Sequence, residues 1–197
     1  AQVLGISNPP ARIEGFDISN ISGTFMVASM VVFRNGRPAN ADYRRYKMKD
    51  VRSQDDFACM AEAVRRRYSR LKKEGRPMPD LILIDGGKGQ LNAALRELGK
   101  LRLTHVPVIG LAKEFEEIHR SNEEAPLRLG LDHNALKLLQ RVRDESHRFA
   151  IRAQRNKKRK KISRSKLDSI KGVGEILKKR LLTKFKSIKN IKSADIN

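Results

Sequence analysis

The stretch LILIDGGKGQLNAA (81–94) decides the fold. Its first four residues are large and apolar without alternation, which is typical of a strand buried on both faces of a parallel sheet. The glycines that follow Asp85 allow a tight turn. Beyond them, apolar side chains recur at helical spacing, at Leu91, Ala94, Leu95 and Leu98. A buried strand that turns directly into an amphipathic helix predicts an α/β fold.

The segments before this unit predict three strands and one helix. The strands are expected at 12–19, 24–33 and 42–48, and Asn35-Gly36 is a strong signal for a hairpin turn between the last two. Apolar residues within 54–74 recur on one helical face, which predicts a helix there.

The segments after the unit predict a strand at 106–111, a hairpin or irregular segment at 114–129, and a long helix at 134–154. The complete order of elements predicts a mixed sheet with helices on both faces.

The charge is concentrated at one end of the chain. The 197 residues carry a formal net charge of +21, and residues 151–197 hold 17 basic and 3 acidic side chains. Such a block predicts a polyanionic partner, either nucleic acid or an anionic membrane surface. We divide the chain into a lead-in linker (1–12), an α/β domain (13–155), a basic linker (156–164) and a small helical domain (165–197).

Several classes of protein are excluded. The longest nearly apolar run, 25–33, is much shorter than the ~20 residues that span a bilayer, and residues 1–4 lack the features of a secretion signal. A single cysteine, Cys59, excludes an intramolecular disulfide and fits a reducing cytoplasm. A structural zinc site is not expected without a cysteine cluster. These patterns predict a soluble cytoplasmic chain.

Two aspartates lie where a sheet would place a ligand. Asp17 lies in the first predicted strand, and Asp85 ends the most hydrophobic one. A carboxylate at the end of a buried strand needs a partner, and oxygen ligands that converge suit Mg²⁺ or Mn²⁺. For Asp85, a turn or helix-capping role is the alternative.

His147 is the histidine that we consider for chemistry. It shares one flank of its predicted helix with Arg143 and Asp144. An imidazole there could bind a metal, carry a proton or contact phosphate. A solvated histidine without a function is the alternative for His147, and it is our interpretation of His105, His119 and His133.

Two glycine-containing turns remain. Residues 86–90 lack the spacing and the Ser or Thr of a phosphate-binding loop, although Lys88 could contact a DNA phosphate. The segment Lys171-Gly172-Val173-Gly174, with leucines on both sides, has the form of a helix-hairpin-helix, whose backbone N–H groups can bind a DNA phosphate. Nearby lysines, including Lys178 and Lys179, would add attraction that salt weakens.

The chain resembles the C-terminal half of the UvrC family, nuclease subunits of the bacterial UvrABC excision repair system. The resemblance rests on collinear motifs: RIEGFDISNISGT (12–24), VASMVVFRNGRP (27–38), DYRRYKMK (42–49), RRRYSRL (65–71), LILIDGGKGQLNAA (81–94), VIGLAK (108–113), LLQRVRDESHRFAI (138–151) and LDSIKGVGEILKKRLL (167–182). It implies a ribonuclease H-like endonuclease followed by a helix-hairpin-helix domain, of which only the first hairpin is present before Asn197.

The resemblance also implies a site. The family's catalytic triad falls on Asp17, Asp85 and His147, and a further acidic position falls on Asp55 or Asp56. The implied reaction is the 5′ incision of damaged double-stranded DNA with Mg²⁺ or Mn²⁺, by a monomer that works with UvrB after UvrA, in the bacterial cytoplasm. Besides Lys88 and the hairpin residues, Arg143 and Arg148 are expected to contact DNA.

Two features bear on activity. Ser53-Gln54 and Ala153-Gln154 depart from the family's usual residues, and neither change touches the implied triad. The alternative function is a non-catalytic DNA-binding or scaffolding fragment of the same complex. The presence of both aspartates and the histidine favours the nuclease, whereas an RNA-binding protein would explain the charge but not Asp17 and Asp85.

Overall fold

The computed structural model describes residues 1–197 except 22–24, 49–54, 122, 169, 171 and 195–197. The chain forms two compact units, Ala1–Ala150 and Ile151–Asn197. Within the described residues, no helix is both long enough and apolar enough to cross a membrane.

The first unit is built on one mixed sheet of the order β3-β2-β1-β5-β6-β7, in which β4 also pairs with β2. Strands β1, β5 and β6 are parallel to one another, and the other pairs are antiparallel. The strands are β1 (Arg12–Ile21), β2 (Phe25–Arg34), β3 (Arg37–Pro38), β4 (Arg44–Lys47), β5 (Leu81–Asp85), β6 (Val108–Ala112) and β7 (Glu117–Arg120). The predicted α/β class is therefore confirmed.

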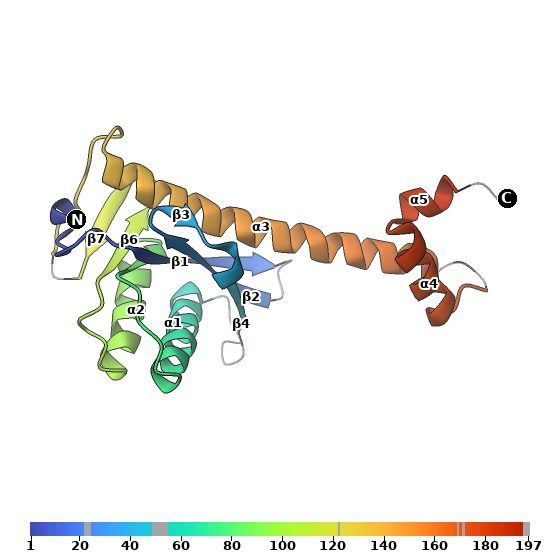
Figure 1. The fold of residues 1–197 in the computed structure, drawn as a ribbon, viewed down its shortest axis with the longest axis horizontal. Helices are drawn as coiled ribbons and strands as arrows, with labels where there is room; N and C mark the ends of the chain where they lie inside the picture. The colour runs from blue at the N-terminus through green and yellow to red at the C-terminus, as the bar shows by residue number, and fades with distance from the viewer. Residues whose placement is uncertain (22–24, 49–54, 122, 169, 171, 195–197) are drawn as a thin grey trace. The chain divides into compact units, whose positions relative to one another are not determined.

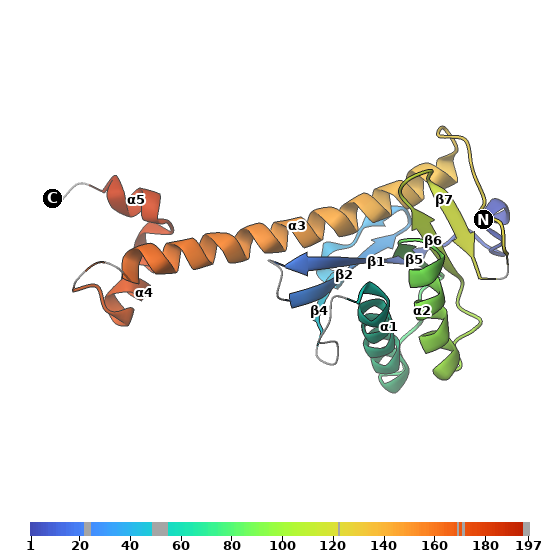
Figure 2. The ribbon, with the colours of Figure 1, turned by 180° about the vertical axis from the view of Figure 1, so that it is seen from behind.

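Helices cover both faces of this sheet (Figures 1 and 2). Helices α1 (Asp56–Lys73) and α2 (Lys88–Lys100) lie side by side on one face, and the first turns of α3 (Asn134–Asp168) lie on the other. Helix α3 approaches the sheet closely at Gly15, where an added Cβ would lie 2.6 Å from Cγ1 of Val142. Only glycine fits at that point without displacing the helix.

The core lies between these layers, and Glu14 is a charged residue that is buried there. The side chain of Glu14 is fully buried, and its carboxylate accepts hydrogen bonds from Arg67, Tyr68 and Arg12. A buried charge persists only when it is paired and hydrogen-bonded in this way. The network ties α1 to the start of β1 and so holds the strand that carries Asp17.

Two segments differ from a simple linker or loop. In the lead-in segment, a 3-10 helix (Gln2–Leu4) forms, and Leu4 and Ile6 are buried. In the segment 114–129, the hairpin alternative is confirmed, because β7 pairs with β6 and the backbone N–H groups of Ile118 and Leu127 each donate to the other's carbonyl. A further 3-10 helix spans Asn40–Asp42.

The helix expected at 134–154 is longer than predicted, and its last part belongs to the second unit. The segment 156–164, interpreted from the sequence as a linker, continues α3 as helix up to Asp168. Lysine and arginine favour helix, and no glycine or proline interrupts the segment. Helices α4 (Glu175–Phe185) and α5 (Ile188–Lys192) follow.

Candidate active site

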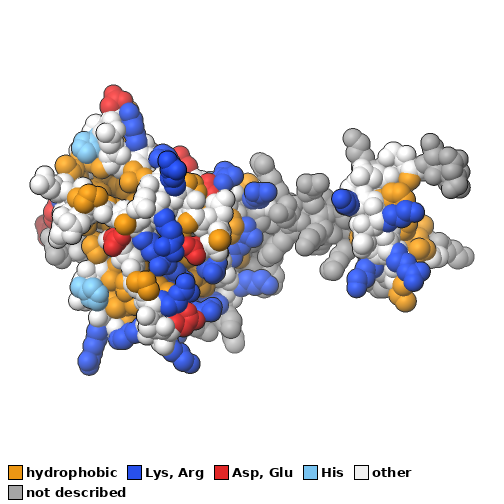
Figure 3. Space-filling model, in the orientation of Figure 1, with side chains coloured by type: hydrophobic (Ala, Val, Ile, Leu, Met, Phe, Trp, Pro, Cys, Tyr) orange, Lys and Arg blue, Asp and Glu red, His pale blue; other side chains and the backbone are white. Residues whose placement is uncertain are grey.

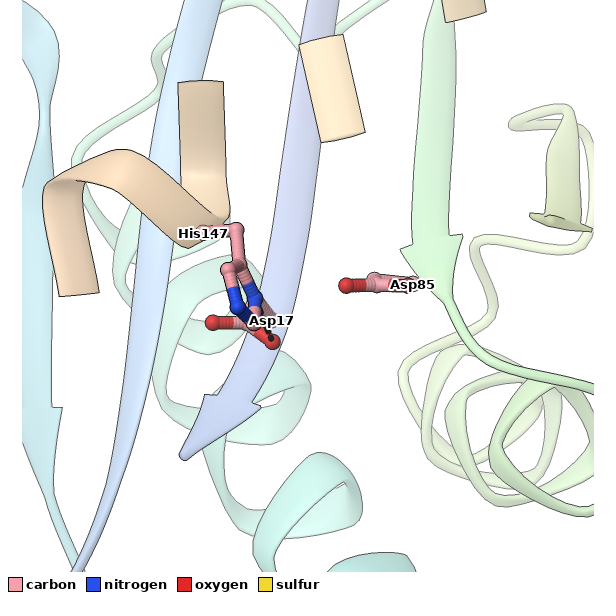
Figure 4. Close-up of side chains that lie close together, drawn as sticks. All are labelled: Asp17, Asp85 and His147. Atoms are coloured by element: carbon pink, nitrogen blue, oxygen red, sulfur yellow. Dashed lines mark ion pairs between the residues drawn. The ribbon is translucent and has the colours of Figure 1, made fainter. Parts of the chain in front are cut away.

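Three side chains from distant parts of the sequence meet on the α3 face of the sheet. Asp17 lies in β1 two residues after Gly15, so its side chain points to the same face as the contact between Gly15 and Val142. Asp85 ends the neighbouring parallel strand, and Figure 4 shows its carboxylate extending toward Asp17. His147 comes from α3, the helix that lies over this face of the sheet, and Figure 4 shows its imidazole beside Asp17.

The geometry of this cluster suits a shared ion. One potential ligand atom from each residue lies within 4.8 Å of the other two. Nδ1 of His147 lies 3.9 Å from Oδ1 of Asp17, as the dashed line in Figure 4 marks. The Asp17 side chain is only 7% exposed, whereas that of His147 is 47% exposed. The site therefore has a buried floor and an open rim.

Burial and like charge act together on the two aspartates. Burial, and then the negative charge of Asp85, raise the pKa of Asp17 to about 7, although Lys113 acts in the opposite direction. Burial also raises the pKa of Asp85, against the lowering effect of Lys113, Arg143 and His147. A buried and a half-buried carboxylate this close favour a cation that compensates their charge.

The polar atoms of the floor are also incompletely paired. Oδ2 of Asp17 is buried and has no hydrogen-bond partner, and neither has the buried hydroxyl of Ser29. Ser29 lies directly opposite Asp17 in the register of β2 with β1. Buried oxygens without partners are rare in folded proteins unless an ion or water completes the site. Two carboxylates and an imidazole with an orphaned oxygen fit Mg²⁺ or Mn²⁺.

The two candidate additional acidic residues have different places. Asp55 is the N-cap of α1, where its carboxylate accepts hydrogen bonds from the backbone N–H groups of Phe57 and Ala58. Asp56 is exposed, and its negative charge adds to the effects that raise the pKa of Asp17. Asp55 therefore caps a helix, and the role of either residue in catalysis stays a prediction.

The predicted DNA-contacting arginines on α3 are engaged by acidic neighbours. Arg143 is buried and forms ion pairs with Glu116 at 2.6 Å and Asp144 at 3.1 Å. Two of its donors, Nε and Nη1, are therefore already bonded to carboxylates inside the protein, and its contact with DNA stays a prediction. Arg148 forms an ion pair with Glu145 but remains 62% exposed. Lys88 is exposed at the start of α2.

The predicted hairpin forms a tight turn before α4. Gly172 has a φ of +90°, a conformation that L side chains rarely adopt, and Gly174 is the N-cap of α4. The N–H of Val173 donates to the carbonyl of Ile170. Lys179 is exposed, but Lys178 is buried, which does not fit its predicted contact with DNA. Lys171 lies outside the described residues, as does Ser53-Gln54.

Two residues near the cluster are missed by the sequence analysis. Lys113 follows β6 and acts on both aspartates, and Ser29 faces Asp17 across the sheet. The signal for Lys113 is its position directly after a buried strand, in the motif VIGLAK (108–113).

Figure 3 shows a band of basic side chains across the visible face of the first unit and further basic side chains on the second.

The family model and the similar curated proteins point to the same family. The family model of the UvrC RNase H endonuclease domain matches residues 1–151. The UvrABC system protein C of Methanococcoides burtonii is 52% identical over 195 residues, and that of Porphyromonas gingivalis strain W83 is 48% identical over 193 residues. Each match covers 98% of this chain and 32% of the relative, so the chain spans about a third of their length.

Among solved structures, the Endonuclease V of Streptomyces avermitilis is similar with a TM-score of 0.45 and 16% sequence identity. That match covers 80% of this chain and 90% of the other.

Proposed function

The chain belongs to the UvrC RNase H endonuclease domain family, and from this we propose that it cuts DNA by hydrolysis at the cluster of Asp17, Asp85 and His147. The observation that carries the proposal is the meeting of these three side chains within 4.8 Å, around a buried carboxylate oxygen that lacks a partner. A purely structural cluster would pair that oxygen inside the protein.

The reaction that we propose is the 5′ incision of a damaged strand in nucleotide excision repair. The resemblance to UvrC and the printed name of the relatives, UvrABC system protein C, support this role. By the same argument, we propose that the chain acts on damaged double-stranded DNA that UvrA and UvrB have marked. It would work there as a monomer together with UvrB, in the cytoplasm.

The cluster would hold Mg²⁺ or Mn²⁺. The two carboxylates are the natural oxygen ligands, and the imidazole of His147 can complete the set. When bound, such an ion polarises the scissile phosphate and lowers the pKa of the attacking water.

The chain's own residues position the reaction. In hydrolysis, the attacking water gives up a proton as its oxygen forms a bond to phosphorus, the P–O bond to the leaving sugar oxygen breaks, and that sugar oxygen takes up a proton. The rigid sheet fixes the two carboxylates, so little reorganisation is needed when charge develops. His147 lies on the open rim at 47% exposure, where a phosphate and its leaving oxygen can reach the imidazole. There it can either bind the ion or transfer a proton.

The second unit would anchor the DNA. Its 17 basic and 3 acidic residues, and the turn at 172–174 before α4, support a phosphate-binding hairpin. Exposed Lys179 is the described lysine of the predicted set that best fits a direct contact.

The test is incision of a 50-base-pair duplex with one bulky lesion and a nick placed 3′ of it, incubated with the full 197-residue chain, UvrA, UvrB, ATP and Mg²⁺. Because the strand is already nicked 3′ of the lesion, the only further cut to be measured is the one on the 5′ side. We expect Asp17→Asn and Asp85→Asn to reduce the rate by at least ~100-fold, whereas Asp132→Asn, at a fully exposed position, retains it. Cutting by either cluster variant at the wild-type rate would mean that this cluster is not the nuclease site. If the wild type also fails to cut while it still binds DNA, the alternative of a non-catalytic module holds.

A further inference from the structure

We propose that Lys113 is a further catalytic residue of this site, whose ammonium group binds a non-bridging oxygen of the scissile phosphate and stabilises the negative charge that develops there. This inference rests on the proposed nuclease function. It adds to the cluster a residue that neither the triad motif nor the metal-ligand geometry includes.

The topology places Lys113 at the correct edge of the sheet. Strands β5 and β6 are parallel, and Asp85 is the register partner of Leu111. Lys113 follows two residues after Leu111, directly beyond the end of β6 at Ala112. Neighbouring strands lie ~4.8 Å apart, and a lysine side chain extends ~6 Å, so the ammonium can reach the space in front of Asp85. The residue is exposed, so the same space is open to a substrate.

The electrostatics of the cluster give independent support. Burial raises the pKa of both Asp17 and Asp85, and Lys113 is the first of the groups that counteract this rise at each of them. The ammonium group therefore acts on both carboxylates, although Lys113 is remote from both in sequence. None of the described carboxylates forms an ion pair with it.

Three described arginines near the cluster already have interaction partners within the protein. Arg143 acts on Asp85 as well, but its guanidinium forms ion pairs with Glu116 and Asp144. Arg148 forms an ion pair with Glu145. Arg45 lies with its guanidinium 3.9 Å from the centre of the Phe149 ring and donates a hydrogen bond to the carbonyl of Phe149. Lys113 differs from these arginines, because it follows the strand next to that of Asp85 and forms no ion pair with any of the described carboxylates.

A charge count indicates what this cation is for. Two ionised aspartates balance one divalent cation, which leaves a site without net charge for an anionic phosphodiester. The ammonium of Lys113 makes the occupied site positive by one charge. Hydrolysis adds a second negative charge to the phosphate in the transition state, and a cation placed there in advance stabilises that state more than the ground state.

The proposal predicts opposite effects of one substitution. Lys113→Met keeps the length of the side chain and removes its charge. It should reduce the rate constant of cutting by ~100-fold, the range found when one preorganised donor to a developing charge is lost, with little change in the KM for DNA. In the absence of DNA, the same substitution should strengthen Mn²⁺ binding by about threefold to tenfold, because a repelling charge near the ion is removed.

The experiment measures both quantities on the full 197-residue chain. Mn²⁺ affinity is taken from the electron paramagnetic resonance signal of free Mn²⁺ in a titration without DNA, and cutting is measured on the nicked duplex described above. Lys73→Met is the matched control, because Lys73 is an exposed lysine in the last turn of α1, about 26 Å along the helix from its first turn. Lys113→Arg, which retains the charge, should recover at least a tenth of the wild-type rate.

The outcomes separate this inference from the function on which it rests. Tighter Mn²⁺ binding with slower cutting supports the role of Lys113, provided that Lys73→Met changes neither. Wild-type cutting by Lys113→Met overturns it, and so does a parallel loss of Mn²⁺ binding and cutting, which would indicate a structural role. If instead Asp17→Asn cuts like the wild type, the proposed function fails first.

Discussion

Substitution of Asp17 by asparagine should make the metal-free protein more stable while it removes the proposed ligand. The carboxyl group of Asp17 has a pKa of about 7 in the folded chain and 3.8 as its ordinary value, because it is buried beside Asp85. Between these two values the folded state binds more protons than the unfolded state, so stability falls as the pH rises through this window. Above pH 7 the destabilisation is complete.

The magnitude follows from the two pKa values. Each pH unit between them corresponds to about 1.4 kcal/mol, so the ionised Asp17 destabilises the fold by about 4 kcal/mol at pH 8. The asparagine amide removes the charge, but its polar atom at the place of Oδ2 remains buried without a partner, at a cost of roughly 2 kcal/mol. The net gain of about 2 kcal/mol corresponds to a rise in Tm of roughly 4–8 °C for a domain of this size.

The assay is thermal unfolding in EDTA at pH 8 and at pH 4.5, with Asp132→Asn as the exposed control. At pH 4.5 the wild-type penalty falls to about 1 kcal/mol, so Asp17→Asn should there be about 1 kcal/mol less stable than the wild type. Mn²⁺ at pH 8 should raise the Tm of the wild type and leave that of Asp17→Asn nearly unchanged. A variant less stable than the wild type at pH 8, or a difference that does not depend on pH, would refute the reasoning.

Three other predictions concern the support of the site. Gly15→Ala should lower stability by about 1–3 kcal/mol in thermal unfolding and slow cutting, because its Cβ would lie 2.6 Å from Val142 and displace the helix that carries His147; a variant with wild-type stability would contradict this close packing. Arg67→Ala should destabilise the fold by about 3–5 kcal/mol in urea unfolding, because Glu14 would lose a buried partner. Arg65→Ala, at an exposed position, should destabilise it by under ~1 kcal/mol. Equal losses for the two variants would show that the hydrogen bonds to Glu14 do not stabilise the fold. Deletion of residues 157–197 should weaken DNA binding and flatten its dependence on salt concentration, and an unchanged slope in a fluorescence titration would exclude the second unit as the DNA anchor.

The parts of the fold that follow one strong local signal are those that the sequence predicts well. The apolar run 81–84 and the helix after it occur as expected, and the Asn35-Gly36 turn joins β2 to β3. The extension of α3 through 156–164 was missed, because dense positive charge was interpreted as a linker although lysine and arginine are good helix formers. Composition alone does not distinguish the two.

The site shows the same division. Asp17 and Asp85 can be proposed from their places in buried strands, and the resemblance to the family adds His147. The different places of Asp55 and Asp56, the ion pairs that occupy Arg143, and the burial of Lys178 depend on tertiary packing. Lys113 and Ser29 depend on strand register, which brings together residues that no local pattern connects.

The central claim is that Asp17, Asp85 and His147 hold one catalytic cation site. Anomalous diffraction from crystals of the full chain soaked in Mn²⁺ tests it most directly. We predict a peak within ~2.0–2.4 Å of a carboxylate oxygen from each aspartate, with His147 beside it, and no such peak in Asp17→Asn. A well-diffracting crystal with Mn²⁺ bound elsewhere, or with the cluster free of density at saturating Mn²⁺, would contradict the account.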